Sequence, residues 1–388
     1  MSRGKKIALV VAIAAVVVVA GFGIAVASWY SGIANNIKGS GDITTLSAPV
    51  ADEPYYVMLI GSDSRDGFDE EPVGDSTGER TDSIMVARVD EKNQTVSMVS
   101  IPRDLRVNVK GHGYCKINSA VEYGGYNTVI NLLNEILGIK INYYAKIYFN
   151  GFEELVDTLG GVTVEVPEYT SYNGVFVPAG DAVTITGVEA LTLARCRHGY
   201  PPDQGAYAMG DYQRTLNQRN LVKAIAKKVL EQDVTKIPSL ITSLSHCIET
   251  NMGVDKIISL ATNMKGMDTE SIDSAQLPIG SSTLNGEWYA LMYQDVFELM
   301  RKNFTEGKAL FDGLDKFNTE CNDDDVNGNF IDGDVYSYTT YSAKYGSPYS
   351  NGYTPTAFTQ DAIDTIASGA AKHSTSSTSS KKKTYDDD

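Results

Sequence analysis

The chain has 388 residues, a formal net charge of −16 at pH 7, and a composition that is 42% hydrophobic and 21% charged. This composition is that of a globular protein, and the length holds one large domain or two ordinary ones. The acidic balance argues against a nucleic-acid-binding protein, because nucleic-acid phosphates require a basic surface. An anionic ligand would instead have to meet a local basic patch.

The N-terminus predicts a membrane anchor. Basic residues within 1–6 precede an apolar run, 7–27, that carries no charge. As a helix this run rises about 31 Å, which is enough to cross the hydrocarbon core of a bilayer. The positive flank places residues 1–6 in the cytoplasm and the remainder outside, as in a single-pass protein of the cell membrane. A cleaved signal peptide is the alternative, since residues 25–27 have the A-x-A form, but the apolar run is longer than a usual signal peptide.

After a polar tether at 28–54, strands and helices interleave along the chain. Apolar runs of strand length predict strands at 55–61, 82–90, 94–102, 143–149, 162–167 and 276–280. Apolar residues at helical spacing predict helices in the second half of 117–138, at 151–161, at 211–232 and from 237 to about 264. The short connection between the second and third strands predicts an antiparallel hairpin. The fold class is therefore α/β, with a central mixed sheet flanked by helices, after one transmembrane helix.

The predicted folded domain spans 55–305, and the composition changes beyond it. Residues 306–372 form an extension rich in Asp, Asn and Tyr, and residues 373–388 are a low-complexity tail predicted to be disordered. Within the extension, DDDVNGNFIDGD (323–334) places Asp or Asn at several ligand positions of an EF-hand-like Ca²⁺ loop. A solvated turn is the favoured alternative, because position 12 is Asp instead of a bidentate Glu.

Three charged residues are predicted to meet at one edge of the sheet. Asp63 follows the first strand, Asp82 begins the second, and Arg103 follows the third. If successive strands are antiparallel, all three emerge at the same edge, where ligands of open α/β sheets bind. Two carboxylates there can share Mg²⁺, which also binds substrate phosphates. Each residue also has a purely structural alternative. Asp63 would cap a turn, Asp82 would start a strand, and Arg103 would form an ion pair with Asp104.

A cationic cluster stands out in this acidic chain. In the helix from 211, Arg214 and Gln218 lie on the same face as the apolar residues that point toward the core. Burying an arginine is unfavourable unless an anion meets it. Arg195 and Arg197 face one side if their segment is extended, as bidentate contacts to phosphate require. The cluster predicts a ligand of pyrophosphate size; the alternative is that Arg214 pairs with Asp203 or Asp211.

Four cysteines in an exported domain permit two disulfides, with three connectivities that the sequence does not distinguish. They are Cys115, Cys196, Cys247 and Cys321. Their spacing does not resemble a zinc site, and free buried thiols are the alternative.

Several ordered motifs resemble one family. They are GSDSR (61–65), RTDSIMVARVD (80–90), SIPRD (100–104), KIN (116–118), GGV (160–162), ARCRH (194–198) and DYQR…Q (211–218). This set is similar to the LytR-CpsA-Psr family of cell-envelope proteins, over roughly residues 55–305. The resemblance implies an α/β domain that binds a polyprenyl-diphosphate-linked glycan, with the lipid tail in an apolar pocket beside the sheet. It also implies a phosphotransferase that moves the glycan phosphate onto peptidoglycan and releases polyprenyl phosphate.

The resemblance also implies roles for individual residues. Asp63 and Asp82 would hold Mg²⁺ (or Mn²⁺) on the diphosphate. The arginines that would grip its oxygens are Arg103, Arg195, Arg197 and Arg214. Gln218 would support these arginines and Arg80 would assist. Asp104 is a candidate base for the acceptor hydroxyl, and its alternative role is to orient Arg103.

One position departs from the family pattern. The family usually has a second arginine just before the glutamine, where this chain has Asn217, while Arg219 follows Gln218. Arg219 projects about 100° around the helix from Gln218, so it is an imperfect substitute. Lys116 is another candidate for the missing charge. Weaker charge neutralisation favours the alternative function, a polyprenyl-(pyro)phosphate-binding scaffold or pyrophosphatase of envelope assembly without transfer activity.

Overall fold

The structure is a computed structural model that describes residues 31–32, 43–62, 81–166, 169–197, 211–284, 287–292 and 294–312. The predicted membrane span at 7–27, the predicted Ca²⁺ loop at 323–334 and the predicted tail at 373–388 lie outside these residues. Among the described residues, no helix combines the length and the apolar character that crossing a membrane requires.

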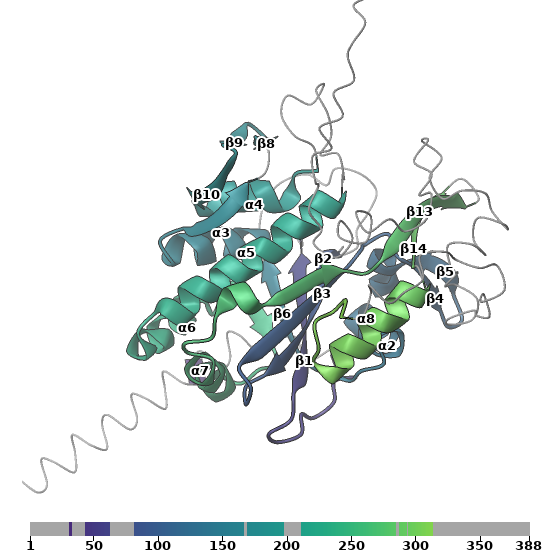
Figure 1. The fold of residues 1–388 in the computed structure, drawn as a ribbon, viewed down its shortest axis with the longest axis horizontal. Helices are drawn as coiled ribbons and strands as arrows, with labels where there is room; N and C mark the ends of the chain where they lie inside the picture. The colour runs from purple at the N-terminus through teal and green to yellow at the C-terminus, as the bar shows by residue number, and fades with distance from the viewer. Residues whose placement is uncertain are drawn as a thin grey trace, which may run out of the picture.

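A mixed six-stranded sheet forms the centre of the fold, as predicted, in the order β11–β6–β1–β2–β3–β12 (Figure 1). In that order the strands are Ile248–Thr250, Ile141–Tyr148, Tyr55–Ser62, Thr81–Asp90, Thr95–Ile101 and Asp273–Gln276. β1, β2 and β3 are antiparallel neighbours, whereas β6 lies parallel to β1 and β12 lies parallel to β3. Ser62 pairs with Thr81, and Ile84 pairs with Ile101. The end of β1, the start of β2 and the end of β3 therefore share one edge, and the predicted hairpin is confirmed.

One face of the sheet packs against helices α2 (Gly125–Leu137) and α8 (Gln294–Glu306), which form the larger hydrophobic core with it. Apolar residues three and four apart along α2 bury one stripe of that helix. The helix ends at Gly138, whose left-handed backbone (φ 65°) suits glycine. The core continues beyond α8, because Leu310 is fully buried and Asn303 donates to its carbonyl.

The opposite side of the sheet carries a second layer of helices, separated in Figure 1 from α2 and α8 by the central strands. This layer contains α3 (Phe149–Thr158), α4 (Gly187–Arg195) and the long helix α5 (Asp211–Glu231). Together with the hairpin of β7 (Val162–Val166) and β10 (Gly180–Ile185), these helices enclose a separate hydrophobic cluster. Helix α7 (Val254–Asn263) packs on β1 and β2 farther along the same face.

Three further hairpins and the short helices complete the fold. The hairpins are β4–β5 (Arg106–Val109, Gly113–Lys116), β8–β9 (Thr170–Tyr172, Val175–Val177) and β13–β14 (Ile279–Leu284, Glu287–Met292). The remaining helices are α6 (Ile237–Leu244) and the 3-10 turns η1 (Ile117–Tyr123), η2 (Val234–Lys236) and η3 (Thr269–Ser271).

Two predicted elements are wrong in extent. The predicted helix from 237 to about 264 is two helices, α6 and α7, with the edge strand β11 between them. The predicted strand at 276–280 is the end of β12 and the start of β13. Pro278 separates these two strands, and a proline has no N–H to continue a ladder. Polar residues at 249–251 and Pro278 mark these two interruptions in the sequence.

The two disulfides that four cysteines permit are not both formed. None of Cys115, Cys196 and Cys247 forms a disulfide, and the last two are buried. Two disulfides among four cysteines would require at least one bond within this set of three. The alternative of buried thiols outside a disulfide holds for Cys196 and Cys247, whereas Cys115 is only partly buried and Cys321 lies outside the described residues.

Candidate active site

A cavity of about 780 Å³ lies between the central sheet and the layer formed by α3, α4 and α5. Most of its lining is apolar and comes from β1, β2, β6, β11 and these helices. The apolar lining residues include Leu59, Met85, Ala145, Ile147, Phe149, Phe152, Leu155, Leu191, Leu221, Val222, Ile225 and Ile248. The polar and charged lining residues include Ser83, Arg103, Arg195, Arg197, Arg214 and Gln218. The cavity thus has an apolar interior and, at one end, a cluster of arginines.

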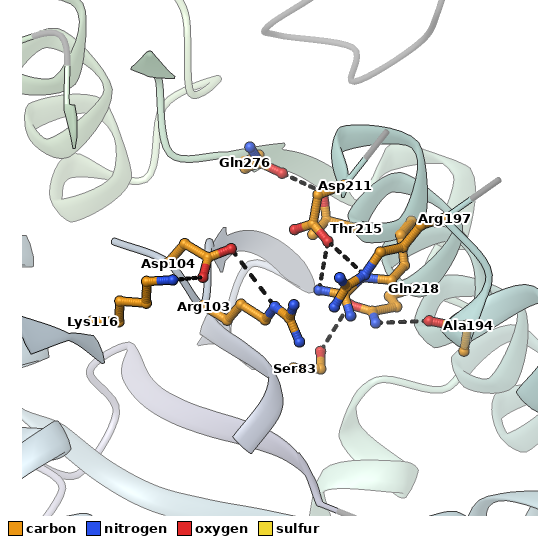
Figure 2. Close-up of polar contacts among 11 residues, drawn as sticks. Ser83, Arg103, Asp104, Lys116, Ala194, Arg197, Asp211, Thr215, Gln218 and Gln276 are labelled. Atoms are coloured by element: carbon orange, nitrogen blue, oxygen red, sulfur yellow. Dashed lines mark hydrogen bonds and ion pairs between the residues drawn. The ribbon is translucent and has the colours of Figure 1, made fainter. Parts of the chain in front are cut away.

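Helix α5 supplies Arg214, whose side chain is only 4% exposed. Its Nη2 lies 2.8 Å from Oδ1 of Asp211, one turn earlier on the helix, and Nε of Arg197 lies 3.4 Å from the same oxygen. Asp211 therefore holds two guanidinium groups side by side at the cavity (Figure 2). The predicted core-facing direction of Arg214 and the alternative of a pair with Asp211 both hold. One carboxylate facing two arginines leaves net positive charge for an anionic ligand.

Gln218 joins three elements at this end of the cavity. Its Nε2 donates to the carbonyl of Ala194 in α4 at 2.9 Å, and its Oε1 accepts from the hydroxyl of Ser83 in β2 at 3.0 Å. Both contacts appear in Figure 2, where Gln218 lies among the arginine side chains. The amide thus fixes α5 against α4 and the sheet edge. The role of Gln218 in supporting the arginines on a ligand stays a prediction.

The arginines of the ARCRH motif reach the cavity from the end of α4. Arg195 is the last residue of this helix, and its guanidinium lies over the rings of Phe149 (4.7 Å) and Tyr172 (4.9 Å). Cys196 follows in extended conformation and is buried, with its thiol donating to the carbonyl of Ser171 at 3.3 Å. The predicted extended segment is thus partly helical, yet Arg195 and Arg197 line the same cavity.

Arg103 enters from the end of β3 and points toward the group around Asp211 (Figure 2). Its Nε lies 3.7 Å from Oδ2 of Asp104, and Nζ of Lys116 lies 3.2 Å from the other oxygen of that carboxylate. Asp104 is thus held between two cations, and its role as a base or in orienting Arg103 stays a prediction. Lys116 is not among the residues that line the cavity.

The sequence profile of the LytR_cpsA_psr family matches residues 25–306, well over half of the chain. The chain belongs to the LytR_cpsA_psr family. It is 30% identical over 247 residues to the "polyisoprenyl-teichoic acid–peptidoglycan teichoic acid transferase TagU" of Halalkalibacterium halodurans, covering 63% of this chain and 76% of that protein. The protein of the same name from Bacillus mycoides is 30% identical over 240 residues, 61% of this chain and 73% of the relative.

Solved structures agree with this assignment. The crystal structure of Bacillus subtilis TagV has 25% sequence identity and a TM-score of 0.57, over 66% of this chain and 98% of that one. An Enterococcus faecalis protein described as a transcriptional regulator has 26% identity and a TM-score of 0.54, over 70% and 97% of the two chains. Almost the whole of each solved chain is therefore matched, by about two thirds of this chain.

The position at which this LytR_cpsA_psr member departs from the family pattern is turned away from the cavity. Asn217 is 1% exposed, and its Oδ1 accepts from Nε2 of Gln213 at 2.9 Å. Arg219 is fully buried and donates from Nη1 to the hydroxyl of Ser100 on β3 at 2.7 Å. Neither residue lines the cavity, so the structure does not bring Arg219 to the predicted ligand site. Burial lowers the pKa of Arg219 to about 9.

The predicted metal ligands are described only in part. Asp63 and Arg80 lie outside the described residues, and the side chain of Asp82 is not described. The backbone nevertheless places Asp82 beside the end of β1, since Thr81 pairs with Ser62. A pair of carboxylates is a donor set that suits Mg²⁺. The metal and the roles of these three residues stay predictions.

Some residues that line the cavity were not predicted from the sequence. Ser83, which donates a hydrogen bond to Gln218, follows Asp82 inside the RTDSIMVARVD motif, so the motif could have identified it. The β8–β9 hairpin, which brings Tyr172 to Arg195, carries no comparable signal, because its strands have three residues each. The apolar lining is likewise concealed in sequence, since cavity walls and packed cores use the same residue types.

Proposed function

We propose that this chain is a membrane-anchored, extracytoplasmic transferase that moves a glycopolymer phosphate from a polyprenyl-diphosphate carrier onto peptidoglycan. The observation that carries the proposal is the cavity, which joins an apolar interior to a cluster of arginines. A polyprenyl diphosphate has two matching parts, a hydrocarbon chain that suits the apolar interior and a diphosphate that suits the arginines. The names of the TagU relatives, which act on a polyisoprenyl-linked teichoic acid and peptidoglycan, support this substrate class. The apolar run at 7–27 would anchor the chain.

The apolar part of the cavity suits the lipid. A volume of about 780 Å³ lies within the range of ligand pockets, about 300–1,000 Å³. Each buried methylene contributes roughly 0.8 kcal/mol, so a branched hydrocarbon chain gains considerable affinity from such walls. Phe152 and Leu155 on α3 and Leu221 on α5 provide these walls from two helices. The lipid would thus be held without any polar contact.

The arginines suit the diphosphate. Guanidinium groups make bidentate contacts with phosphate oxygens, and they retain their charge when partly buried. Arg103, Arg197 and Arg214 approach from β3, the end of α4 and α5, so they can neutralise charge on several oxygens at once. Because phosphoryl transfer depends on positioning and charge stabilisation, this arrangement favours the transition state over the free substrate.

The chemical step is a displacement at phosphorus. An acceptor hydroxyl of peptidoglycan forms a bond to the phosphorus that carries the glycan, and the bond to the bridging oxygen breaks. That oxygen leaves with polyprenyl phosphate, and the hydroxyl proton passes to a base. The ion pairs of Asp104 with Lys116 and Arg103 favour a positioning role for this residue over that of the base. Asp63 and Asp82 would hold Mg²⁺, which would supply further charge neutralisation at the diphosphate.

A scaffold or pyrophosphatase that binds the polyprenyl diphosphate without transferring the glycan is the second candidate. It is favoured by Asn217 and Arg219, which leave the cavity with one fewer arginine than the family pattern provides. The four arginines that do line the cavity, and the carboxylate pair predicted at its edge, favour the transferase.

A reconstituted reaction separates the two functions. The full-length chain in detergent would receive a polyprenyl-diphosphate-linked sugar, peptidoglycan fragments and Mg²⁺, and both polyprenyl phosphate release and sugar attachment would be followed. We expect Arg103→Ala to lower the attachment rate by about 10²–10³-fold, and Asp82→Ala to abolish it. Arg106→Ala is the matched control, since Arg106 stacks on Tyr114 at 3.8 Å and does not line the cavity.

The outcomes are distinct. Attachment that depends on Arg103 and Asp82 but not on Arg106 supports the transferase. Release of polyprenyl phosphate without attachment supports a pyrophosphatase. Binding of the lipid with no turnover, indifferent to Asp82→Ala, supports a scaffold and overturns the proposal.

A further inference from the structure

A second group of chemically active side chains lies outside the arginine cluster. Glu154 on α3 faces His246 and Cys247, which lie between α6 and β11. Nε2 of His246 lies 3.0 Å from Oε2 of Glu154, and the Cys247 thiol lies 3.4 Å from the same oxygen. One ligand atom from each of the three residues lies within 4.8 Å of the others. An imidazole, a thiol and a carboxylate thus converge on one point.

The spacing of these atoms is close to that of a tetrahedral zinc site. Zinc binds thiolate sulfur at about 2.3 Å, and imidazole nitrogen and carboxylate oxygen at about 2.0–2.2 Å. Ligand atoms at the corners of such a tetrahedron stand roughly 3.3–3.6 Å apart. The two separations from Oε2 of Glu154 are 3.0 and 3.4 Å and the third pair of ligand atoms lies within 4.8 Å, so modest side-chain movements reach this geometry. Hard cations such as Mg²⁺ prefer oxygen ligands alone and would not select this set.

We propose that Glu154, His246 and Cys247 form a zinc site, with the fourth position left to water. On binding, the Cys247 thiol loses its proton to solvent and its sulfur becomes a ligand, while Glu154 exchanges its hydrogen bonds for a bond to the metal. Glu154 and His246 are exposed, so the ion can enter directly from solvent, whereas Cys247 is buried and anchors the site.

The surroundings hold the three ligands in place. A Cβ added at Gly151 would lie 2.6 Å from Cβ of Cys247, so the start of α3 is pressed against this cysteine. The backbone N–H of Cys247 donates to the carbonyl of Leu244 at 3.0 Å, which fixes the turn after α6. Because two ligands lie on this turn and the third on α3, a bound ion would cross-link two separate segments of the chain.

That cross-link would lie behind the walls of the lipid cavity. Helix α3 carries Phe152 and Leu155, and β11 begins with Ile248, all of which line the cavity. Zinc held by Glu154 and Cys247 would therefore fix the position of two walls relative to each other. The site shares no residue with the arginine cluster, so zinc binding does not depend on the proposed transferase function.

The test is a zinc titration of the full-length chain in detergent, against a chromophoric chelator and with a reducing agent present. We expect one equivalent of Zn²⁺ to bind, and cobalt substituted for zinc to give a thiolate-to-metal charge-transfer band. Cys247→Ser should remove that band and weaken zinc binding by at least about tenfold, as should His246→Ala and Glu154→Gln. The matched controls, Cys115→Ser and His112→Ala, change the same residue types elsewhere and should leave the affinity unchanged.

Two results would overturn the proposal. One is the absence of stoichiometric zinc binding to a wild-type chain that is shown to be folded by its thermal unfolding transition. The other is an affinity that Cys247→Ser leaves unaltered, because the ion would then be bound elsewhere. Thermal unfolding of each variant without metal separates loss of a ligand from loss of the fold. Failure of glycan transfer has no bearing on either readout, so the two proposals fail independently.

Discussion

The two ends of the cavity have opposite chemistry, although the same elements build both. Strand β2 gives Ser83 to the polar end and Met85 to the apolar one, and helix α5 gives Arg214 to the first and Leu221 and Ile225 to the second. Two residues of strand, or two turns of helix, separate these roles. The boundary between the charged end and the apolar end of the cavity is therefore fixed by rigid elements. A ligand that contacts both ends must be amphipathic.

The largest effect is expected at the charged end. Arg214→Ala should lower the rate of glycan transfer by about 10²–10³-fold, because a charge-stabilising group aimed at the phosphoryl oxygens is lost. Binding of an uncharged polyprenol should stay unchanged, since the apolar walls are intact. The measurement is single-turnover transfer beside polyprenol affinity. Lys227→Ala on the same helix is the control, because the pair of Lys227 with Glu270 is exposed and contributes little. Equal losses in transfer and polyprenol binding would refute the separation of the two ends.

A smaller effect is expected at the apolar end. Val222→Trp should fill part of the cavity and weaken binding of a long polyprenyl phosphate by about 10–100-fold, while a short-chain analogue keeps its affinity. Added volume in packed surroundings costs about 1–3 kcal/mol, so thermal unfolding must be measured alongside. Val229→Trp, two turns farther along α5 and outside the cavity lining, is the control. Loss of both ligands alike would mean that the lipid does not occupy this part of the cavity.

These two ends were not equally predictable from sequence. Arg103, Arg195, Arg197 and Arg214 stand out because arginines clustered in an acidic chain require an explanation, and the structure gathers all four at one cavity. The apolar walls carry no such signal, because a cavity lining and a packed core have the same composition. The resemblance to the family implied a lipid pocket, and the structure shows an apolar cavity with the lining residues given above.

The fold was predictable where contacts are local. Strands β1, β2 and β3 follow one another, and the short turn between β2 and β3 fixes their register. Strand β12 joins the same sheet from about 170 residues farther on, so neither its pairing with β3 nor its boundary at Gln276 follows from local pattern. Strand β11 has only three residues, too few to show a strand pattern in the sequence. Only the completed sheet distinguishes it from the helices on either side.

Arg219 and its neighbour Gln218 differ in position, because Gln218 lines the cavity and Arg219 does not. Because the structure buries the guanidinium of Arg219 against Ser100, Arg219→Met should leave the free energy of unfolding unchanged or raise it by up to about 2 kcal/mol. Transfer should be nearly unaffected. Urea denaturation measures the first and the reconstituted reaction the second. A loss of several kcal/mol would show that an anion outside the described residues meets the guanidinium.

The effect of Arg219→Met on stability should depend on pH. Burial lowers the pKa of Arg219 to about 9, below its value in the unfolded chain. Above about pH 9 the unfolded chain therefore binds more protons at this residue than the folded chain does, and stability rises with pH. Below that pH the contribution is constant. Wild type should consequently gain stability relative to Arg219→Met between pH 8 and about pH 10, as urea midpoints of both proteins will show. A difference independent of pH would contradict the depressed pKa.

The smallest effect concerns the helix that presents Arg195. At the start of α4, a carboxylate oxygen of Glu189 accepts from the backbone N–H and from the hydroxyl of Thr186, both at 2.8 Å. Glu189→Ala removes these contacts and should cost about 0.5–1 kcal/mol of stability. Transfer should change less than twofold, because Arg195 at the far end of α4 is also held over the rings of Phe149 and Tyr172. Glu165→Ala, at an exposed position of β7, is the control for removal of a surface carboxylate. A large loss of transfer at unchanged stability would show that the position of Arg195 depends on the start of its helix, and that the charged end is less rigid than its contacts indicate.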